Sequence, residues 1–134
     1  MYYKLYSDAA KYPDSNKIGI GVLLVTQSKQ IQTKFETTAK DNHEGEFKAC
    51  IKALEFLKSS NSESDLKKSV LNYYTDSKIL AESLDKQYAK HYQKYVDQIL
   101  SLESEFSLVF NNWIPDRKNH GAHTLAIQAL HKTN

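Results

Sequence analysis

Hydrophobic and polar residues near the start of the chain follow patterns that are typical of β-strands. Ile18 to Val25 form a continuous apolar run with two glycines, which favours a strand buried on both faces. From Ile31 to Thr37 apolar and polar positions alternate, which predicts a half-exposed strand. The aromatic-rich segment from Tyr2 to Asp8 is expected to be a strand that ends in an acid. Three successive strands with polar turns between them predict an antiparallel meander.

After residue 46 the hydrophobic period changes to that of an amphipathic helix, with apolar residues at positions 47, 50, 51, 54 and 57. Residues 59–65 are polar and predict a loop, and Val70 to Thr75 predict a fourth strand that is followed by Asp76. The remaining expected elements are a helix over Ser77 to Leu84, a helix marked by Tyr92 to Leu102, a strand from Phe106 into Trp113, and a helix over about Lys118 to His131. Strands joined by crossover helices indicate a single α/β domain over residues 1–134, with helices packed against a mixed sheet.

Composition and charge restrict the function only weakly. The chain has 134 residues, of which 40% are hydrophobic and 25% are charged, an ordinary balance for one globular domain. Its formal net charge of +2 is too small to indicate a nucleic-acid-binding protein by itself. The single cysteine, Cys50, cannot form an intrachain disulfide and has apolar neighbours, so we expect a buried thiol and a cytoplasmic protein. No apolar run is long enough to span a membrane, and we expect a monomer.

Three acids carry the candidate chemistry. Asp8 and Asp76 each follow an apolar strand, and if these strands are parallel neighbours both carboxylates emerge at the same sheet edge. Glu46 precedes Cys50 by four residues and therefore shares the inward face of its helix. Inward acids are costly unless they are paired, and three together favour a hard divalent cation. Taken singly, each acid has an ordinary alternative, because Asp8 could lie in a turn, Asp76 could cap a helix and Glu46 could be a surface charge.

Four segments resemble the motifs of type 1 ribonuclease H, in the order of that family and across essentially the whole chain. These segments are Tyr6-Ser7-Asp8-Ala9-Ala10, Asn42 to Ala49, Tyr74-Thr75-Asp76-Ser77, and Trp113-Ile114-Pro115 with Asn119, Ala122, Leu125 and Ala126 after it. The resemblance implies the ribonuclease H-like fold, in which helices flank a five-stranded mixed sheet. It also implies an endonuclease that hydrolyses the RNA strand of RNA–DNA hybrids and leaves a 5′-phosphate and a 3′-hydroxyl.

The same resemblance implies a catalytic site. The carboxylates of Asp8, Glu46 and Asp76 would hold two divalent ions, Mg²⁺ or Mn²⁺, of which one activates a water and the other stabilises the leaving 3′ oxygen. Asn42 matches a residue that reaches the minor groove of the hybrid and helps to sense the 2′-hydroxyl, the group that distinguishes RNA from DNA. Thr75 matches a residue near the phosphate of the DNA strand.

The fourth motif departs from the family. There the family has a metal-binding Asp after Ala, whereas Ala122 of this chain is followed by His123. A neutral imidazole can bind a divalent metal, but it brings no negative charge and favours Mn²⁺ over Mg²⁺. We expect His123 to be the fourth catalytic residue and metal ligand. Three alternatives stay open: a histidine that is merely packed, a catalytically silent paralogue that binds nucleic acid or a protein partner, and a DNA-directed nuclease, which the Asn-containing second motif disfavours.

A second departure is Ala9, which stands where the family usually has Gly and restricts how closely a phosphate approaches that backbone. The segment between Leu84 and Phe106 is also short for the basic protrusion that grips the hybrid in some members. Its lysines, Lys86, Lys90 and Lys94, could form a weaker basic patch or simply a solvated helix face. We therefore expect modest, salt-sensitive affinity for the hybrid.

Overall fold

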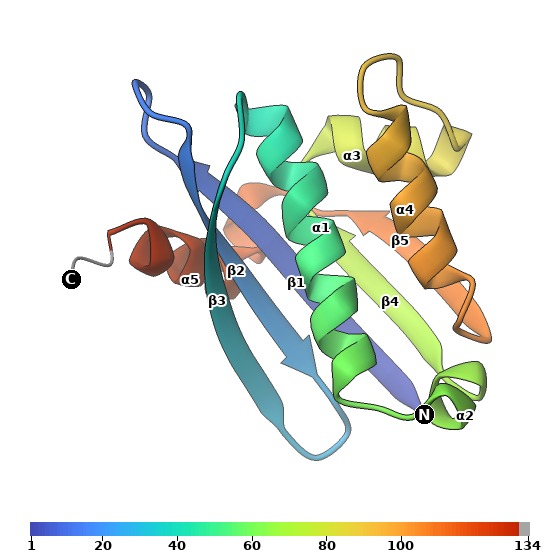
Figure 1. The fold of residues 1–134 in the computed structure, drawn as a ribbon. Coiled ribbons are helices and arrows are strands. Elements are labelled where there is room, and N and C mark those ends of the chain that lie inside the picture. Colours follow the sequence, from blue (N-terminus) through green and yellow to red (C-terminus); the bar gives the residue numbers. More distant parts are fainter. Residues whose placement is uncertain (132–134) are drawn as a thin grey trace.

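A five-stranded sheet forms the centre of the computed structural model, which describes residues 1–131 (Figure 1). Its strands are β1 (Tyr2–Lys11), β2 (Lys17–Val25), β3 (Gln30–Thr38), β4 (Val70–Thr75) and β5 (Leu108–Trp113). They lie in the order β3-β2-β1-β4-β5, with β1 to β3 antiparallel and with β4 parallel to both β1 and β5. The predicted meander and mixed sheet are therefore confirmed. Residues 132–134, the end of the domain expected over 1–134, lie outside the described residues.

Helices cover both faces of this sheet (Figure 1). They are α1 (Asn42–Ser59), α2 (Glu63–Lys67), α3 (Lys78–Lys86), α4 (Gln93–Glu103), the 3-10 helix η1 (Asp116–Lys118) and α5 (His120–Leu130). The helices α1 and α4 lie side by side on one face, while α5 lies on the other. Within residues 1–131, no helix combines the length and the apolar character that crossing a membrane requires.

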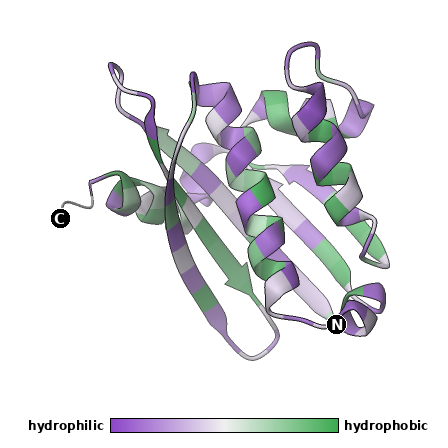
Figure 2. Cartoon of the chain, in the orientation of Figure 1, coloured by the Kyte–Doolittle hydropathy of each residue, from purple (hydrophilic) through white to green (hydrophobic). Residues whose placement is uncertain are grey.

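The strand β2 is buried on both faces, as its apolar run predicted. Ile18 and Ile20 are fully buried in the same hydrophobic cluster as Phe47 of α1. On the opposite face, a Cβ atom at Gly19 or Gly21 would overlap backbone atoms of α5, so the absence of a side chain lets this helix lie directly on the strand. Figure 2 shows β2 as mostly hydrophobic, whereas β3 at the sheet edge alternates between hydrophilic and hydrophobic residues.

Several predicted boundaries were wrong, among them the start of the fifth strand, which is Leu108 and not Phe106. The polar run over residues 59–65 is not entirely a loop, because the Ser62 side chain accepts a hydrogen bond from Asp65 N and caps the short helix α2. In addition, β1 does not end at Asp8 but continues to Lys11, since the β1–β2 hairpin pairs as far as Lys11 and Ile18. Asp8 is therefore a residue within a strand. Hydrophobic pattern alone does not show how far a hairpin partner extends a strand.

Candidate metal centre

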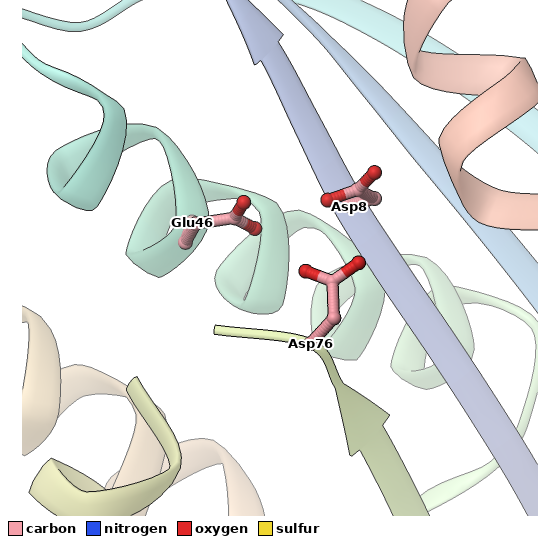
Figure 3. Close-up of side chains that lie close together, drawn as sticks. All are labelled: Asp8, Glu46 and Asp76. Carbon is pink, nitrogen blue, oxygen red and sulfur yellow. The ribbon is translucent and has the colours of Figure 1, made fainter. Parts of the chain in front are cut away.

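Three carboxyl groups meet at one end of the sheet, close to the point where β1 and β4 stop pairing (Figure 3). Asp8 lies on β1, Asp76 directly follows β4, and Glu46 lies near the start of α1. One potential ligand oxygen from each carboxyl group lies within 4.8 Å of the other two. The structure thus brings together the three acids that the sequence predicted to converge.

The parallel pairing of β1 with β4 positions two of these acids. Tyr6 and Tyr74 form the last residue pair of this parallel ladder, and their rings stack with centroids 4.7 Å apart. Asp8 follows two residues later within β1, and Asp76 follows two residues later, just beyond the end of β4. Their side chains therefore emerge together beyond the stacked rings, although β1 itself continues.

The N-terminus of α1 positions the third acid. Asp41 is the N-cap residue, and its Oδ1 accepts a hydrogen bond from Glu44 N at 2.7 Å. Glu44 in turn accepts one from Lys40 N at 2.8 Å and another from the Tyr95 hydroxyl of α4 at 2.6 Å. These contacts, which are similar to a capping box, fix the first turn of α1. Glu46 follows in the next turn and points toward the sheet (Figure 3).

Burial and mutual repulsion make these carboxyl groups hard to ionise together. Burial raises the pKa of Glu46 well above its ordinary value, and the charges of Asp8 and Asp76 raise that pKa further. Burial and the charge of Asp8 raise the pKa of Asp76 to about 6. Glu46 Oε1 is buried and has no hydrogen-bond partner among the described residues. A divalent cation would supply both a partner and a compensating charge, so these residues fit such an ion.

Two side chains, one at the end of β5 and one in the segment beyond it, donate hydrogen bonds to Asp76. Trp113 Nε1 donates a hydrogen bond to the Asp76 carbonyl oxygen at 3.0 Å. The buried Asn119 donates through Nδ2 to Asp76 Oδ2 at 3.3 Å and to the Ser7 carbonyl oxygen at 3.0 Å. In the sequence, Asn119 is recognisable only as part of the fourth motif. The contacts show that it ties the segment before α5 to both β1 and the end of β4.

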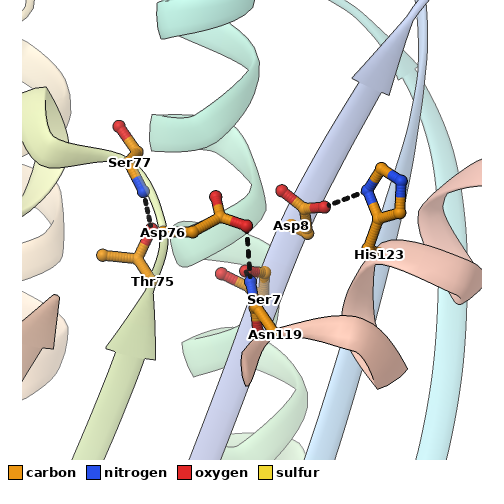
Figure 4. Close-up of polar contacts among 7 residues, drawn as sticks. All are labelled: Ser7, Asp8, Thr75, Asp76, Ser77, Asn119 and His123. Atoms are coloured by element: carbon orange, nitrogen blue, oxygen red, sulfur yellow. Dashed lines mark hydrogen bonds and ion pairs between the residues drawn. The ribbon is translucent and has the colours of Figure 1, made fainter. Parts of the chain in front are cut away.

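His123 lies beside Asp8 but outside the group of three acids. Its Nδ1 is 2.8 Å from Asp8 Oδ2, so an Nδ1–H donates to this carboxylate (Figure 4). This hydrogen bond opposes the rise that burial causes in the pKa of Asp8. Gly21 lies close to this contact, because it pairs with Asp8 across the β1–β2 hairpin and packs against Ala122 of α5. The role of His123 as a metal ligand stays a prediction.

Comparison with known proteins assigns the family. A family model described as Reverse transcriptase-like matches residues 7–129. The chain belongs to this Reverse transcriptase-like family. It is 35% identical over 131 residues to an Enterococcus faecalis protein named "Putative hydrolase EbsB", a match that covers 96% of this chain and 94% of the relative.

Solved structures of ribonuclease H1 proteins share the fold of this domain. The enzyme of the archaeon Halobacterium salinarum has a TM-score of 0.82 at 19% identity, covering 97% of this chain and 98% of that one. LC11-RNase H1 in complex with an RNA/DNA hybrid has a TM-score of 0.83 at 19% identity, with 96% of each chain covered. An N-terminal RNase H domain from Mycobacterium tuberculosis has a TM-score of 0.80 at 20% identity, covering 97% of this chain and 99% of that one. At these identities the likeness shows the fold, which confirms the predicted ribonuclease H-like architecture.

An open cavity of about 530 Å³ lies over the acids of this ribonuclease H-like domain. Its wall contains the three acids together with Ala9, Asp116, Arg117, His120 and His123. Ala9 is therefore part of the surface that a substrate would meet, as expected from its place after Asp8. Asp116 and Arg117 were not predicted, because η1 is too short to leave a hydrophobic period in the sequence.

A second cavity shares Glu46 and Asp76 with the first and extends toward the start of α1 and α3. Asn42, the exposed first residue of α1, lines it together with Lys78. Thr75 lies differently: its side chain is buried, and its Oγ1 accepts a hydrogen bond from Ser77 N at 3.1 Å. It thereby holds the turn between β4 and α3. The contacts of Asn42 with RNA and of Thr75 with DNA stay predictions.

Proposed function

We propose that this ribonuclease H-like domain is an endonuclease that hydrolyses the RNA strand of RNA–DNA hybrids and leaves a 5′-phosphate and a 3′-hydroxyl. The observation that carries the proposal is the convergence of Asp8, Glu46 and Asp76, with a buried Glu46 oxygen that has no hydrogen-bond partner within residues 1–131. Two further findings support it: the LC11-RNase H1 structure contains an RNA/DNA hybrid, and the E. faecalis relative is named a hydrolase.

The three carboxylates would hold two divalent ions, which supply an activated water and stabilise the leaving 3′ oxygen when bound. The residues around them keep the carboxylates in place. Trp113 holds the backbone of Asp76, and Asn119 donates to its carboxylate and so orients it. His123 orients Asp8 through Nδ1, which leaves Nε2 of the half-exposed imidazole as the nitrogen available to an ion or to the substrate.

In this proposal, RNA is recognised at the second cavity, the one lined by Asn42 and Lys78. Asn42 offers an amide at its exposed wall, and an amide can both donate to and accept from a 2′-hydroxyl. Lys78 lies in the same cavity, with its Nζ 5.1 Å from the centre of the Trp113 ring, and supplies a positive charge for a phosphate. Because this cavity shares Glu46 and Asp76 with the first, one nucleic-acid strand could contact both.

A cleavage assay tests the proposal. Labelled RNA–DNA hybrid, duplex DNA and duplex RNA are each incubated with the protein in Mg²⁺ and in Mn²⁺. We expect cleavage of the RNA strand of the hybrid alone, faster in Mn²⁺ because the imidazole of His123 prefers that ion. His123→Asp is expected to shift the preference toward Mg²⁺. Cleavage by His123→Asp with an inactive parent would instead favour the alternative, a catalytically silent paralogue that binds nucleic acid or a protein partner.

A further inference from the structure

The charge of the proposed metal centre is incomplete without a further acid. Two divalent ions carry four positive charges, whereas Asp8, Glu46 and Asp76 supply three negative ones. His123 adds none, because an imidazole binds metal only in its neutral form. With both ions bound, such a site would carry a net positive charge, and this charge would weaken the binding of the second ion. A fourth anionic group near the cavity would correct this imbalance.

Asp116 is such a group. It is exposed, lines the same cavity as the three acids, and is the first residue of η1. No lysine, arginine or histidine among residues 1–131 forms an ion pair with it. Burial is the main cause of the raised pKa of Glu46 and of Asp76, and the negative charge of Asp116 adds a smaller rise to both.

The backbone around Asp116 is tied to the metal centre on both sides. Before it, Ile114 N donates to the Thr75 carbonyl oxygen at 2.8 Å, next to Asp76. After it, Asn119 N donates to the Asp116 carbonyl oxygen at 2.9 Å, while the Asn119 side chain donates to Asp76. The position of Asp116 is therefore fixed relative to Asp76, although its side chain is exposed.

We propose that Asp116 provides the fourth negative charge of the metal centre by hydrogen bonding to ion-bound water. The inference rests on the proposed function, since it assumes that the three acids hold divalent ions. An indirect contact fits the structure, because Asp116 is not among the residues whose ligand oxygens lie within 4.8 Å of one another. It also fits the ions, since Mg²⁺ keeps several waters when bound to protein, and outer carboxylates strengthen metal binding.

Calorimetric titration with Mn²⁺ in the absence of substrate tests this role. Asp116→Asn removes the charge and keeps the size, and we expect it to weaken ion affinity by about tenfold or more, the range for outer-shell partners. Asp65→Asn is the matched control, because Asp65 is an exposed acid of α2 at the opposite end of the sheet (Figure 1). It should bind Mn²⁺ as the parent does. Equal affinities for both variants would overturn the proposal.

A double variant separates charge from structure. Adding His123→Asp to Asp116→Asn places a new carboxylate on the same cavity wall, so Mn²⁺ affinity should recover toward that of the parent. No recovery in a folded double variant would mean that Asp116→Asn acted by disturbing η1, against the proposal. Failure of the parent itself to bind Mn²⁺ would remove the proposed function and this inference together. A parent that binds Mn²⁺ and cleaves hybrid, with an Asp116→Asn variant of equal affinity, would remove only the inference.

Discussion

Asp76 has the most completely defined surroundings of the three central acids. Its carbonyl oxygen accepts a hydrogen bond from Trp113, and its carboxylate accepts one from Asn119. Burial and the nearby charge of Asp8 nevertheless raise its pKa to about 6. Neutral hydrogen-bond donors therefore hold Asp76 in place, while its surroundings disfavour the ionised carboxylate. This arrangement suits a carboxylate whose charge a bound cation would stabilise.

Asp76→Asn separates these two effects. Under the proposed function, hydrolysis of the hybrid should fall by at least about a hundredfold, because the variant loses a carboxylate that is proposed to bind the ions. In metal-free buffer at pH 8, where the parent's Asp76 is ionised, the variant should be more stable to urea by about 1–2 kcal/mol. Cleavage at the parent rate would show that Asp76 does not bind the ions. A loss of both stability and activity would mean that its charge supports the fold.

At the scale of elements, the contact between β2 and α5 controls one wall of the site. Gly21 lies opposite Asp8 and directly beneath Ala122, and the next residue of α5 is His123. Any displacement of α5 from β2 therefore changes the distance between the imidazole and Asp8. The glycine acts on the site through helix packing without lining the cavity.

Gly21→Ala should test this packing. Its Cβ would overlap the Ala122 carbonyl oxygen, a backbone atom that cannot turn aside, so we expect a loss of about 2–3 kcal/mol in the free energy of unfolding. The matched control is Gly121→Ala, whose Cβ would meet only the flexible end of Leu23. Urea unfolding measures both. Similar stabilities for the two variants would show that β2 and α5 do not need the close approach.

The sequence predicted the presence of helices and strands better than it predicted the residues at which they begin and end. Alternation and apolar runs predicted the meander and α1, because these patterns follow from which faces are buried. The extension of β1 beyond Asp8 depends on pairing with β2, which no local pattern records. The same limit decides which site residues could be predicted. The three acids lie next to recognisable apolar segments, whereas Asp116 lies in a three-residue 3-10 helix and Asn119 directly follows it.

At the scale of the whole molecule, pH is expected to change stability through a group outside the site. Glu103, at the end of α4, is buried and accepts a hydrogen bond from Asn111 Nδ2 of β5 at 3.1 Å. Burial raises the pKa of Glu103 to about 7, although this hydrogen bond opposes the rise. Glu103 Oε2 and Asn111 Oδ1 are both buried without a partner among the described residues. A proton on Glu103 supplies the missing donor.

This raised pKa sets the sign of the pH dependence. The folded chain holds the Glu103 proton more tightly than the unfolded chain. Glu103 therefore contributes about 3 kcal/mol to the free energy of unfolding below about pH 4.5, and this contribution is lost as the pH rises to about 7. Glu103→Gln keeps a neutral side chain and should remove this part of the dependence in urea unfolding between pH 5 and 8. The exposed Glu82→Gln should keep the parent's profile. A profile for Glu103→Gln that matches the parent's would exclude Glu103 as the source.

The hydrogen bond from Asn119 to Ser7 joins residues that are 112 positions apart. A ribosome makes β1 and all three acids long before it makes Asn119 and His123. Throughout that interval the nascent chain carries the acids without the side chains that restrain Asp8 and Asp76. Synthesis that stops before η1 would therefore release a chain that carries all three acids but lacks the side chains that contact Asp8 and Asp76.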